Sequence, residues 1–253
     1  MKIFPLGVGG AFTKSNYHNN YIIELDNKFL LIDAGTTLRN SLPAASFNYL
    51  AIDYVFISHL HYDHVGGLEE LVMSRFWQFE NGRHSPLKTT IIVHEKLVAL
   101  LKNYLGNSLD NQGRTVDDFC DFILLKDGMP FTIGKYSFSV IDTTNFHADG
   151  LISAGFKLSS ESANIVFSGD IKNLVAANLV QHVDENTVAI FQDVSFTFNG
   201  VHATLEEVLD YYPVSFHEII YAMHYNDNAE DYKEEIQAAK IRLVKMQEVL
   251  EII

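Results

Sequence analysis

Short apolar runs of strand length recur along the whole chain, and most of them end in glycine, aspartate, asparagine or histidine. Runs of this length, bounded by residues of this kind, are typical of β-strands. The runs are MKIFPLG, NYIIEL, KFLLIDAG, IDYVFISH, TTIIVHE, DFILLKDG, YSFSVIDTT, LISAGFKL, ANIVFSGD, TVAIFQDV and HEIIYAMH. Helices are predicted between them over residues 64–74, 95–105, 173–181, 203–211 and 229–253. This interleaving of strands and helices predicts an α/β fold.

The last predicted helix, over residues 229–253, has one narrow apolar stripe. Its apolar residues recur every three or four positions, at Ile236, Ala239, Leu243, Met246, Leu250 and Ile253. This spacing predicts a helix that packs one face against the sheet. A contact between two copies of the chain is the alternative.

Nothing in the sequence divides the 253 residues into separate units. There is no linker rich in proline, glycine or serine, no low-complexity tract and no tandem repeat. A chain of this length buries enough surface for one large core. We therefore predict a single domain over residues 1–253.

The composition is that of an ordinary globular protein, with 47% apolar and 20% charged residues. No apolar stretch reaches the roughly 18 residues that a membrane helix needs, and the start of the chain does not resemble a signal peptide. Cys120 is the only cysteine, so no disulfide forms within the chain. We expect a cytoplasmic protein without a membrane partner.

The charge balance limits the class of partner. With 32 acidic and 18 basic residues, the formal net charge is −14. A long nucleic acid needs a basic surface, so duplex DNA or bulk RNA is not expected to bind. A small anionic substrate is compatible with this charge if bound metal ions supply positive charge locally.

Candidate metal ligands crowd together directly after one apolar run. In the stretch SHLHYDHVGG the run Tyr54–Ile57 is followed by His59, His61, Asp63 and His64. A buried strand has no need of four such side chains at its end. Imidazole nitrogens and carboxylate oxygens are ligands for Zn²⁺ and neighbouring metals. The cluster therefore predicts a metal site.

Three further ligand-type residues also lie at or just beyond the ends of apolar runs. They are His147 in DTTNFHADG, Asp170 in VFSGD and His224 in IIYAMHYND. By contrast, we interpret His18, His84, His94, His182 and His217 as surface or core residues without a ligand role.

The HxHxDH motif, followed by a later His, a GD pair and a last His in that order, resembles the metallo-β-lactamase superfamily. The resemblance spans most of the chain and implies a four-layer αβ/βα sandwich. It implies that His59, His61 and His147 hold one metal ion, that Asp63, His64 and His224 hold a second, and that Asp170 bridges the two. It also implies that an aspartate at position 33 supports the metal loop.

A site of this kind activates water for hydrolysis. Two divalent ions about 3.5 to 4 Å apart share a water, favour its ionisation to hydroxide and stabilise charge on the attacked centre. A carboxylate such as Asp170 can bridge two ions. The diiron, oxygen-reducing branch of the superfamily carries glutamate where this chain has His61, so hydrolysis is favoured over redox chemistry. The same ligands accept Zn²⁺ or Mn²⁺.

The stretch FQDVSFTFNGVHATLEEV resembles the tRNase Z and phosphodiesterase branch of the superfamily. That resemblance implies that His202 protonates the leaving oxygen, with Asp193 as its orienting partner. Thr204, in the His-Ala-Thr motif, is a candidate substrate contact. The alternative is that His202 only begins a helix, with Thr204 as its N-cap.

True tRNase Z enzymes carry an extended arm for tRNA between the residues that correspond to His147 and Asp170. Here this segment holds only two predicted strands, ISAGFKLSS and ANIVFSGD. A small phosphodiester therefore suits the chain better than tRNA. Within the branch, the chain is similar to bacterial and phage anti-Pycsar phosphodiesterases, which destroy cyclic nucleotide signals.

Aromatic and basic residues follow the metal motif in LEELVMSRFWQFENGRHSPL. Trp77 is a candidate to stack on a nucleobase, and Arg75 is a candidate phosphate contact. Burial of these aromatic residues, or a contact in a homodimer, is the alternative.

Two other functions remain open from the sequence. A lactonase or another carboxylic-ester hydrolase of the same superfamily shares all the metal ligands but does not need the pair formed by Asp193 and His202. A non-catalytic metal-binding interaction module would be expected to have lost ligands, and none is lost here.

Overall fold

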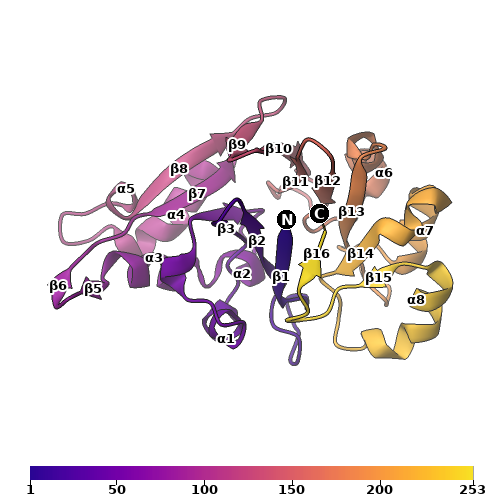
Figure 1. Cartoon of the computed structure of the whole chain (residues 1–253), viewed down its shortest axis with the longest axis horizontal. Helices are drawn as coiled ribbons and strands as arrows, with labels where there is room; N and C mark the ends of the chain where they lie inside the picture. Colours follow the sequence, from indigo (N-terminus) through magenta and orange to yellow (C-terminus); the bar gives the residue numbers. More distant parts are fainter. Residues whose placement is uncertain (253) are drawn as a thin grey trace.

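The computed structural model describes residues 1–252, and two seven-stranded sheets face each other at its centre (Figure 1). The first sheet has the order β16-β1-β2-β3-β4-β7-β8. Its strands are β1 (Lys2–Gly7), β2 (Asn20–Leu25), β3 (Lys28–Ile32), β4 (Tyr54–Ile57), β7 (Thr89–His94), β8 (Cys120–Leu125) and β16 (Leu250–Glu251).

The second sheet has the order β15-β14-β13-β12-β11-β10-β9. Its strands are β9 (Phe131–Ile133), β10 (Tyr136–Asp142), β11 (Ala154–Ser159), β12 (Asn164–Phe167), β13 (Thr187–Asp193), β14 (Ile220–Met223) and β15 (Arg242–Leu243). A separate hairpin consists of β5 (Phe79–Glu80) and β6 (Arg83–His84).

Helices cover the outer face of each sheet, which completes four layers and confirms the predicted αβ/βα sandwich (Figure 1). On the first sheet lie α1 (Leu38–Ala44), η1 (Tyr49–Ala51), α2 (Tyr62–Val65), α3 (Leu68–Phe76), α4 (Val98–Leu109) and α5 (Val116–Phe119). With the second sheet are α6 (Leu174–Ala177), η2 (Leu179–His182), α7 (Leu205–Tyr211), η3 (Val214–Ile219), η4 (Ala229–Tyr232) and α8 (Lys233–Ala239). None of the helices in the described part of the chain is long and apolar enough to span a bilayer.

Strand β4 shows how the sequence builds these layers. Successive side chains of a strand point to opposite faces of the sheet. Phe56 belongs to the core between the two sheets, whereas Val55 and Ile57 belong to the core under the helices of the first sheet. A continuous apolar run is therefore required, because both faces of β4 are buried.

Stacked aromatic rings cross the second sheet from strand to strand. The rings of Phe138 and Phe156 lie 4.5 Å apart, and those of Phe156 and Phe167 lie 5.1 Å apart. Phe191 and Tyr221 continue the series, each 5.2 Å from the ring before it. This ladder fills much of the space between the sheets and holds strands β10 to β14 in register.

The prediction of one long helix over residues 229–253 is wrong. Helix α8 ends at Ala239, because Lys240 takes a left-handed backbone conformation with φ 59°. The chain then forms β15 beside β14, and β16 beside β1. This pairing satisfies the backbone N–H and C=O groups on the edges of β14 and β1. A helix in the same place would leave those groups without partners. The last residue of the predicted stripe, Ile253, lies outside the described residues.

Candidate metal centre

Strands that run in the same direction bring the candidate ligands to one end of the two sheets. In the first sheet β3 and β4 are parallel, and Asp33 and His59 follow their carboxyl ends. In the second sheet β12, β13 and β14 are parallel, and Asp170, Asp193 and His224 lie at or just after theirs. The site therefore lies where the carboxyl ends of both sheets meet, as is usual in α/β proteins.

Two of these residues have an uncommon backbone conformation. Asp33 and His224 have φ angles of 58° and 56°, in the left-handed region that side chains other than glycine seldom adopt. Each lies directly after a strand, so the chain turns sharply at the point where the side chain is needed. Strain of this kind is characteristic of functional sites.

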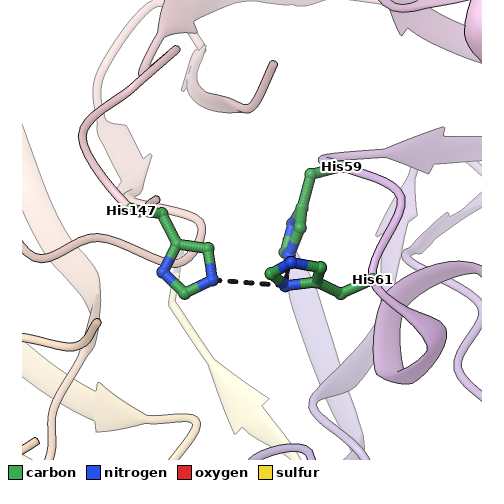
Figure 2. A group of neighbouring side chains, drawn as sticks. All are labelled: His59, His61 and His147. Atoms are coloured by element: carbon green, nitrogen blue, oxygen red, sulfur yellow. Dashed lines mark hydrogen bonds between the residues drawn. The ribbon is translucent and has the colours of Figure 1, made fainter. Parts of the chain in front are cut away.

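The first group of candidate ligands consists of three converging imidazole rings (Figure 2). His59 Nε2 lies 3.0 Å from His61 Nδ1, and His147 Nε2 lies 3.3 Å from the same atom. Burial lowers the pKa of His59 well below its usual value, with the nearby His64 as the next cause. His59 is thus held neutral, which is the state that a metal ligand requires.

The second group consists of Asp63, His64, Asp170 and His224, all of which are buried. Asp63 Oδ2 lies 3.3 Å from His64 Nε2 and 3.2 Å from His224 Nε2. Two carboxylates and two imidazoles therefore face one another in a space closed to solvent.

Asp170 lies between the two groups. Its Oδ2 atom is 3.2 Å from Nε2 of both His64 and His224. The same oxygen is 3.8 Å from His147 Nε2 and 4.0 Å from His59 Nε2. A single carboxylate oxygen is thus close to histidines of both groups, as a carboxylate that bridges two ions must be.

The donor set fits divalent metal ions. Asp170 Oδ1 is buried and has no hydrogen-bond partner. A buried carboxylate oxygen without a partner is unfavourable unless it meets a cation. Imidazole nitrogens together with carboxylate oxygens suit Zn²⁺ and Mn²⁺. The site therefore fits divalent metal ions, and every residue of both candidate groups is in place.

A second layer of hydrogen bonds orients the ligands, and here the prediction for Asp33 is confirmed. Asp33 accepts hydrogen bonds from the backbone N–H and the hydroxyl of Ser58, both at 2.8 Å, and lies 2.7 Å from His64 Nδ1. His147 Nδ1 donates to the carbonyl of Val201 at 2.8 Å. Such contacts fix the ring orientation and leave Nε2 free for a metal ion.

His202 and Asp193 form a hydrogen-bonded pair beside the ligands. His202 Nδ1 lies 2.8 Å from Asp193 Oδ2, so the shorter aspartate side chain does reach the imidazole. The ring of His202 lies 4.8 Å from that of His224 and 4.9 Å from that of His147. Burial acts to lower the pKa of His202, but the Asp193 carboxylate outweighs this and raises the pKa above its usual value.

Thr204 is the N-cap of α7, as the alternative interpretation expects. Its hydroxyl accepts from the backbone N–H of Glu207 at 3.3 Å, and the Glu207 carboxylate accepts from the Thr204 N–H at 2.7 Å. This capping box fixes the start of the helix two residues after His202. A contact between Thr204 and a substrate stays a prediction.

Arg75 does not lie free for a phosphate, which corrects the interpretation drawn from the sequence. Its side chain is buried, and its guanidinium donates to the carbonyls of Tyr49 at 2.7 Å and Lys88 at 3.2 Å. Those bonds tie α3 to neighbouring segments. Trp77 follows α3 and stacks on His84 of the β5–β6 hairpin, which projects at the left of Figure 1, away from α2. Its predicted stacking on a nucleobase remains a prediction.

Most of the groups that support the candidate ligands could not be predicted from the sequence. The carbonyl of Val201 and the hydroxyl of Ser58 gave no signal of their own, because every residue has a backbone carbonyl and serine is common in loops. Gly10 did give one, since a Cβ at this position would lie 3.2 Å from Cε1 of His224. The glycines in LGVGGAF therefore mark a close approach of the β1–β2 connection to the site.

Comparisons with known proteins agree with this geometry. The family model described as "Anti-Pycsar protein Apyc1" matches residues 1–250. An anti-Pycsar protein Apyc1 of Paenibacillus sp. (strain J14) is 33% identical over 242 residues, with 92% of each chain covered. One of Bacillus phage BSP38 is 30% identical over 242 residues, with 91% of each chain covered.

Solved structures share the fold at low sequence identity. The short form of human tRNase Z has a TM-score of 0.74 at 16% identity and covers 100% of both chains. A diphosphatase from the PhnP family has a TM-score of 0.73 at 16% identity, covering 99% of this chain and 97% of its own. A metallo-β-lactamase fold protein of Bacillus subtilis has a TM-score of 0.74 at 16% identity and covers 98% of both chains. With a metallo-β-lactamase fold and a family match over nearly its whole length, the chain belongs to the anti-Pycsar protein Apyc1 family.

Proposed function

We propose that the protein hydrolyses small phosphodiesters, with cyclic nucleotides as the preferred substrates, at a centre of two metal ions. It is a metal-dependent hydrolase of the phosphodiesterase class. The observation that carries the finer proposal is the position of Asp170 Oδ2 between two complete groups of ligands. The hydrogen-bonded pair formed by Asp193 and His202 lies beside it.

The two groups would each hold one ion, Zn²⁺ or Mn²⁺. His59, His61 and His147 would bind the first and Asp63, His64 and His224 the second, with Asp170 shared by both. When bound, such ions make water a nucleophile near neutral pH and stabilise charge on the phosphate. The structure supports this division, since the two groups of side chains are separate and Asp170 is near both.

His202 would donate a proton to the leaving oxygen. The Asp193 carboxylate holds His202 Nδ1 and leaves Nε2 available to act as the donor. Its raised pKa keeps a larger share of the imidazole protonated near neutral pH. A lactonase has no comparable need for this pair, so the contact between His202 and Asp193 favours a phosphodiester substrate.

The segment between His147 and Asp170 supports a small substrate. It holds β11 and β12 and no extended arm. Together with the net charge of −14, this favours a small substrate over tRNA. We therefore expect faster hydrolysis of a cyclic mononucleotide or a model diester than of pre-tRNA or a lactone. Turnover of each with Mn²⁺ and Zn²⁺ in turn tests this, and efficient 3′ processing of pre-tRNA would refute the choice of substrate.

Metal loading should release protons. In the metal-free site burial acts to lower the pKa of His64 and His224, but Asp170 and the other nearby carboxylates together outweigh it for both, and the pKa of His224 rises to about 10. Both imidazole rings are then protonated on both nitrogens at neutral pH. Each ring must lose one of these protons before the freed nitrogen can bind a metal ion. We expect release of about two protons per chain, and an affinity that falls as the pH is lowered.

Calorimetric titration of metal into the chelator-treated protein, in two buffers of different ionisation enthalpy, measures this release. His224→Ala should lower it by about one proton. Equal heats in the two buffers would show that the metal-free site holds no such protons.

A homodimer also remains part of the proposal. Trp77 and Phe79 are exposed near the β5–β6 hairpin and offer an apolar surface to a second copy. The mass measured by sedimentation equilibrium, for the native protein and for Trp77→Ala, tests whether two chains associate through this surface.

A further inference from the structure

The β1–β2 connection runs directly over the second group of ligands. The backbone N–H of Gly10 donates to the carbonyl of Tyr225 at 3.2 Å, next to His224. On the other side, the hydroxyl of Tyr62 donates to the carbonyl of Ala11. Tyr62 lies between the candidate ligands His61 and Asp63 in the chain. Residues 10 and 11 therefore join two ligand-bearing segments at the rim of the site.

Asp227 fixes the far side of this connection. Its carboxylate accepts from the hydroxyl of Thr13 at 2.5 Å, the backbone N–H of Lys14 at 2.7 Å and the side-chain amide of Asn16 at 3.0 Å. Asp227 lies three residues after His224, so the loop is tied to the same segment that carries a candidate ligand. The conformation of residues 10–16 is thus set by contacts on both sides.

Phe12 lies between these two anchors, and 82% of its surface is exposed. An apolar ring that a well-anchored loop holds in water adds almost nothing to the stability of the fold, because it buries almost none of its surface. Its neighbour across the loop, Tyr62, is 45% exposed, and the other edge of the Tyr62 ring meets His18 at 5.6 Å between centroids. Two partly or fully exposed aromatic rings thus border the second ligand group.

The charges around this rim are mixed. The loop carries Lys14 and the negative charge of Asp227, which accepts the backbone N–H of Lys14, and Lys172, beyond Asp170 in the chain, is paired with Glu207 at 2.7 Å. With the phosphate at the metal centre, the rest of a nucleotide needs another source of affinity. Aromatic side chains supply it by stacking on the π-face of a base.

We propose that Phe12, supported by Tyr62, is the surface on which the base of a cyclic nucleotide stacks while its phosphate lies at the metal centre. This inference rests on the proposed phosphodiesterase function and adds the residue that recognises the base. Because Phe12 is held from both sides, little ordering of the loop is needed when the substrate binds.

Phe12→Ala tests the proposal with two substrates and one binding measurement. The substrates are adenosine 3′,5′-cyclic monophosphate and methyl β-D-ribofuranoside 3′,5′-cyclic phosphate, the same cyclic diester without any aromatic ring. The ligand is a slowly hydrolysed phosphorothioate analogue of the cyclic nucleotide, titrated calorimetrically into the metal-loaded protein. We expect Phe12→Ala to raise the Kd of the analogue and the KM of the cyclic nucleotide by about five- to 100-fold, the range found when a stacking aromatic residue is removed.

The KM for methyl β-D-ribofuranoside 3′,5′-cyclic phosphate should stay near the native value in Phe12→Ala, and Phe12→Trp should bind the analogue as well as the native protein does. Met129→Ala is the matched control, because it removes another long apolar side chain, 65% exposed, from the turn between β8 and β9. Met129→Ala should change the KM for neither substrate.

An unchanged Kd and KM in Phe12→Ala, with the native protein active on the cyclic nucleotide, would overturn the stacking role and leave the proposed function intact. An equal rise in KM for both substrates would also overturn it, because Phe12 would then shape the site and not recognise the base. A native protein that hydrolyses neither diester would instead refute the proposed function.

Discussion

Asp170→Asn should lower kcat/KM by at least about 10³-fold on every phosphodiester, because stabilisation of transition-state charge by metal ions is worth several kcal/mol. Asp170 Oδ2 is the one described carboxylate oxygen that lies within 4.0 Å of histidines from both ligand groups. The amide has the same shape but no negative charge, so it cannot hold two cations together. Elemental analysis should show a metal content that falls from about two ions per chain to one or fewer.

The control for Asp170→Asn is Asp210→Asn, which changes an exposed aspartate of α7 in the same way. It should keep the native metal content and rate. The far-ultraviolet circular dichroism of both variants establishes that the fold is intact. An Asp170→Asn protein that retains two ions and hydrolyses diesters at the native rate would contradict the bridging role.

The convergence of the candidate ligands could be predicted from the sequence because the chemistry and the topology follow the same rule. His59, Asp170 and His224 each come just after an apolar run, and parallel strands end at one edge of a sheet. The motif therefore indicated both the residue types and their convergence. Asp193 and His202 were predicted as partners from a resemblance alone, and the structure brings their side chains together at 2.8 Å.

The C-terminal segment could not be predicted in this way, because its pattern has two physical solutions. Leu243, Met246 and Leu250 are spaced for a helix, but they also pack against the core between the sheets from short strands and a loop. Only the unpaired edges of β14 and β1 decide between the two, and those edges exist only after the sheets have formed. Tertiary structure here overrides local spacing.

The burial of polar side chains could not be predicted from the sequence either. Arg75 is charged, and a charged side chain is expected at the surface of a protein. Its burial depends on two backbone carbonyls, at Tyr49 and Lys88, that come from segments on either side of it in the chain. Conversely, Phe12 is apolar, and nothing local indicates that its ring lies in solvent.

The second large effect is expected from His202→Ala, and it should depend on the leaving group. A general acid typically contributes about 10² to 10⁴ in rate. A ribose oxygen leaves poorly without a proton, whereas p-nitrophenolate is stable as an anion near neutral pH. We therefore expect a loss of about 10² to 10⁴ in kcat for a cyclic nucleotide and a far smaller loss for bis-p-nitrophenyl phosphate. Metal content should stay native, because His202 is outside the two ligand groups defined above and its Nδ1 is held by Asp193 at 2.8 Å.

His59→Ala provides the contrast, since it should damage both reactions together by disturbing the metal centre. His182→Ala, a histidine on η2 away from the ligand groups, should affect neither. Equal slowing of both substrates by His202→Ala, with metal retained, would remove the general-acid role and leave His202 as a positioning residue.

The pH profile separates the role of Asp193 from that of His202. The carboxylate of Asp193 raises the pKa of His202, so its loss must lower that pKa. A general acid works while it is protonated, so hydrolysis of a cyclic nucleotide should decline as the pH rises through the pKa of His202. In Asp193→Asn this alkaline decline should move to lower pH, whereas the profile for bis-p-nitrophenyl phosphate should keep its position. A decline that stays in place for the cyclic nucleotide would mean that the Asp193 charge does not act through His202, and the hydrogen bond between them would then serve only to hold the loop.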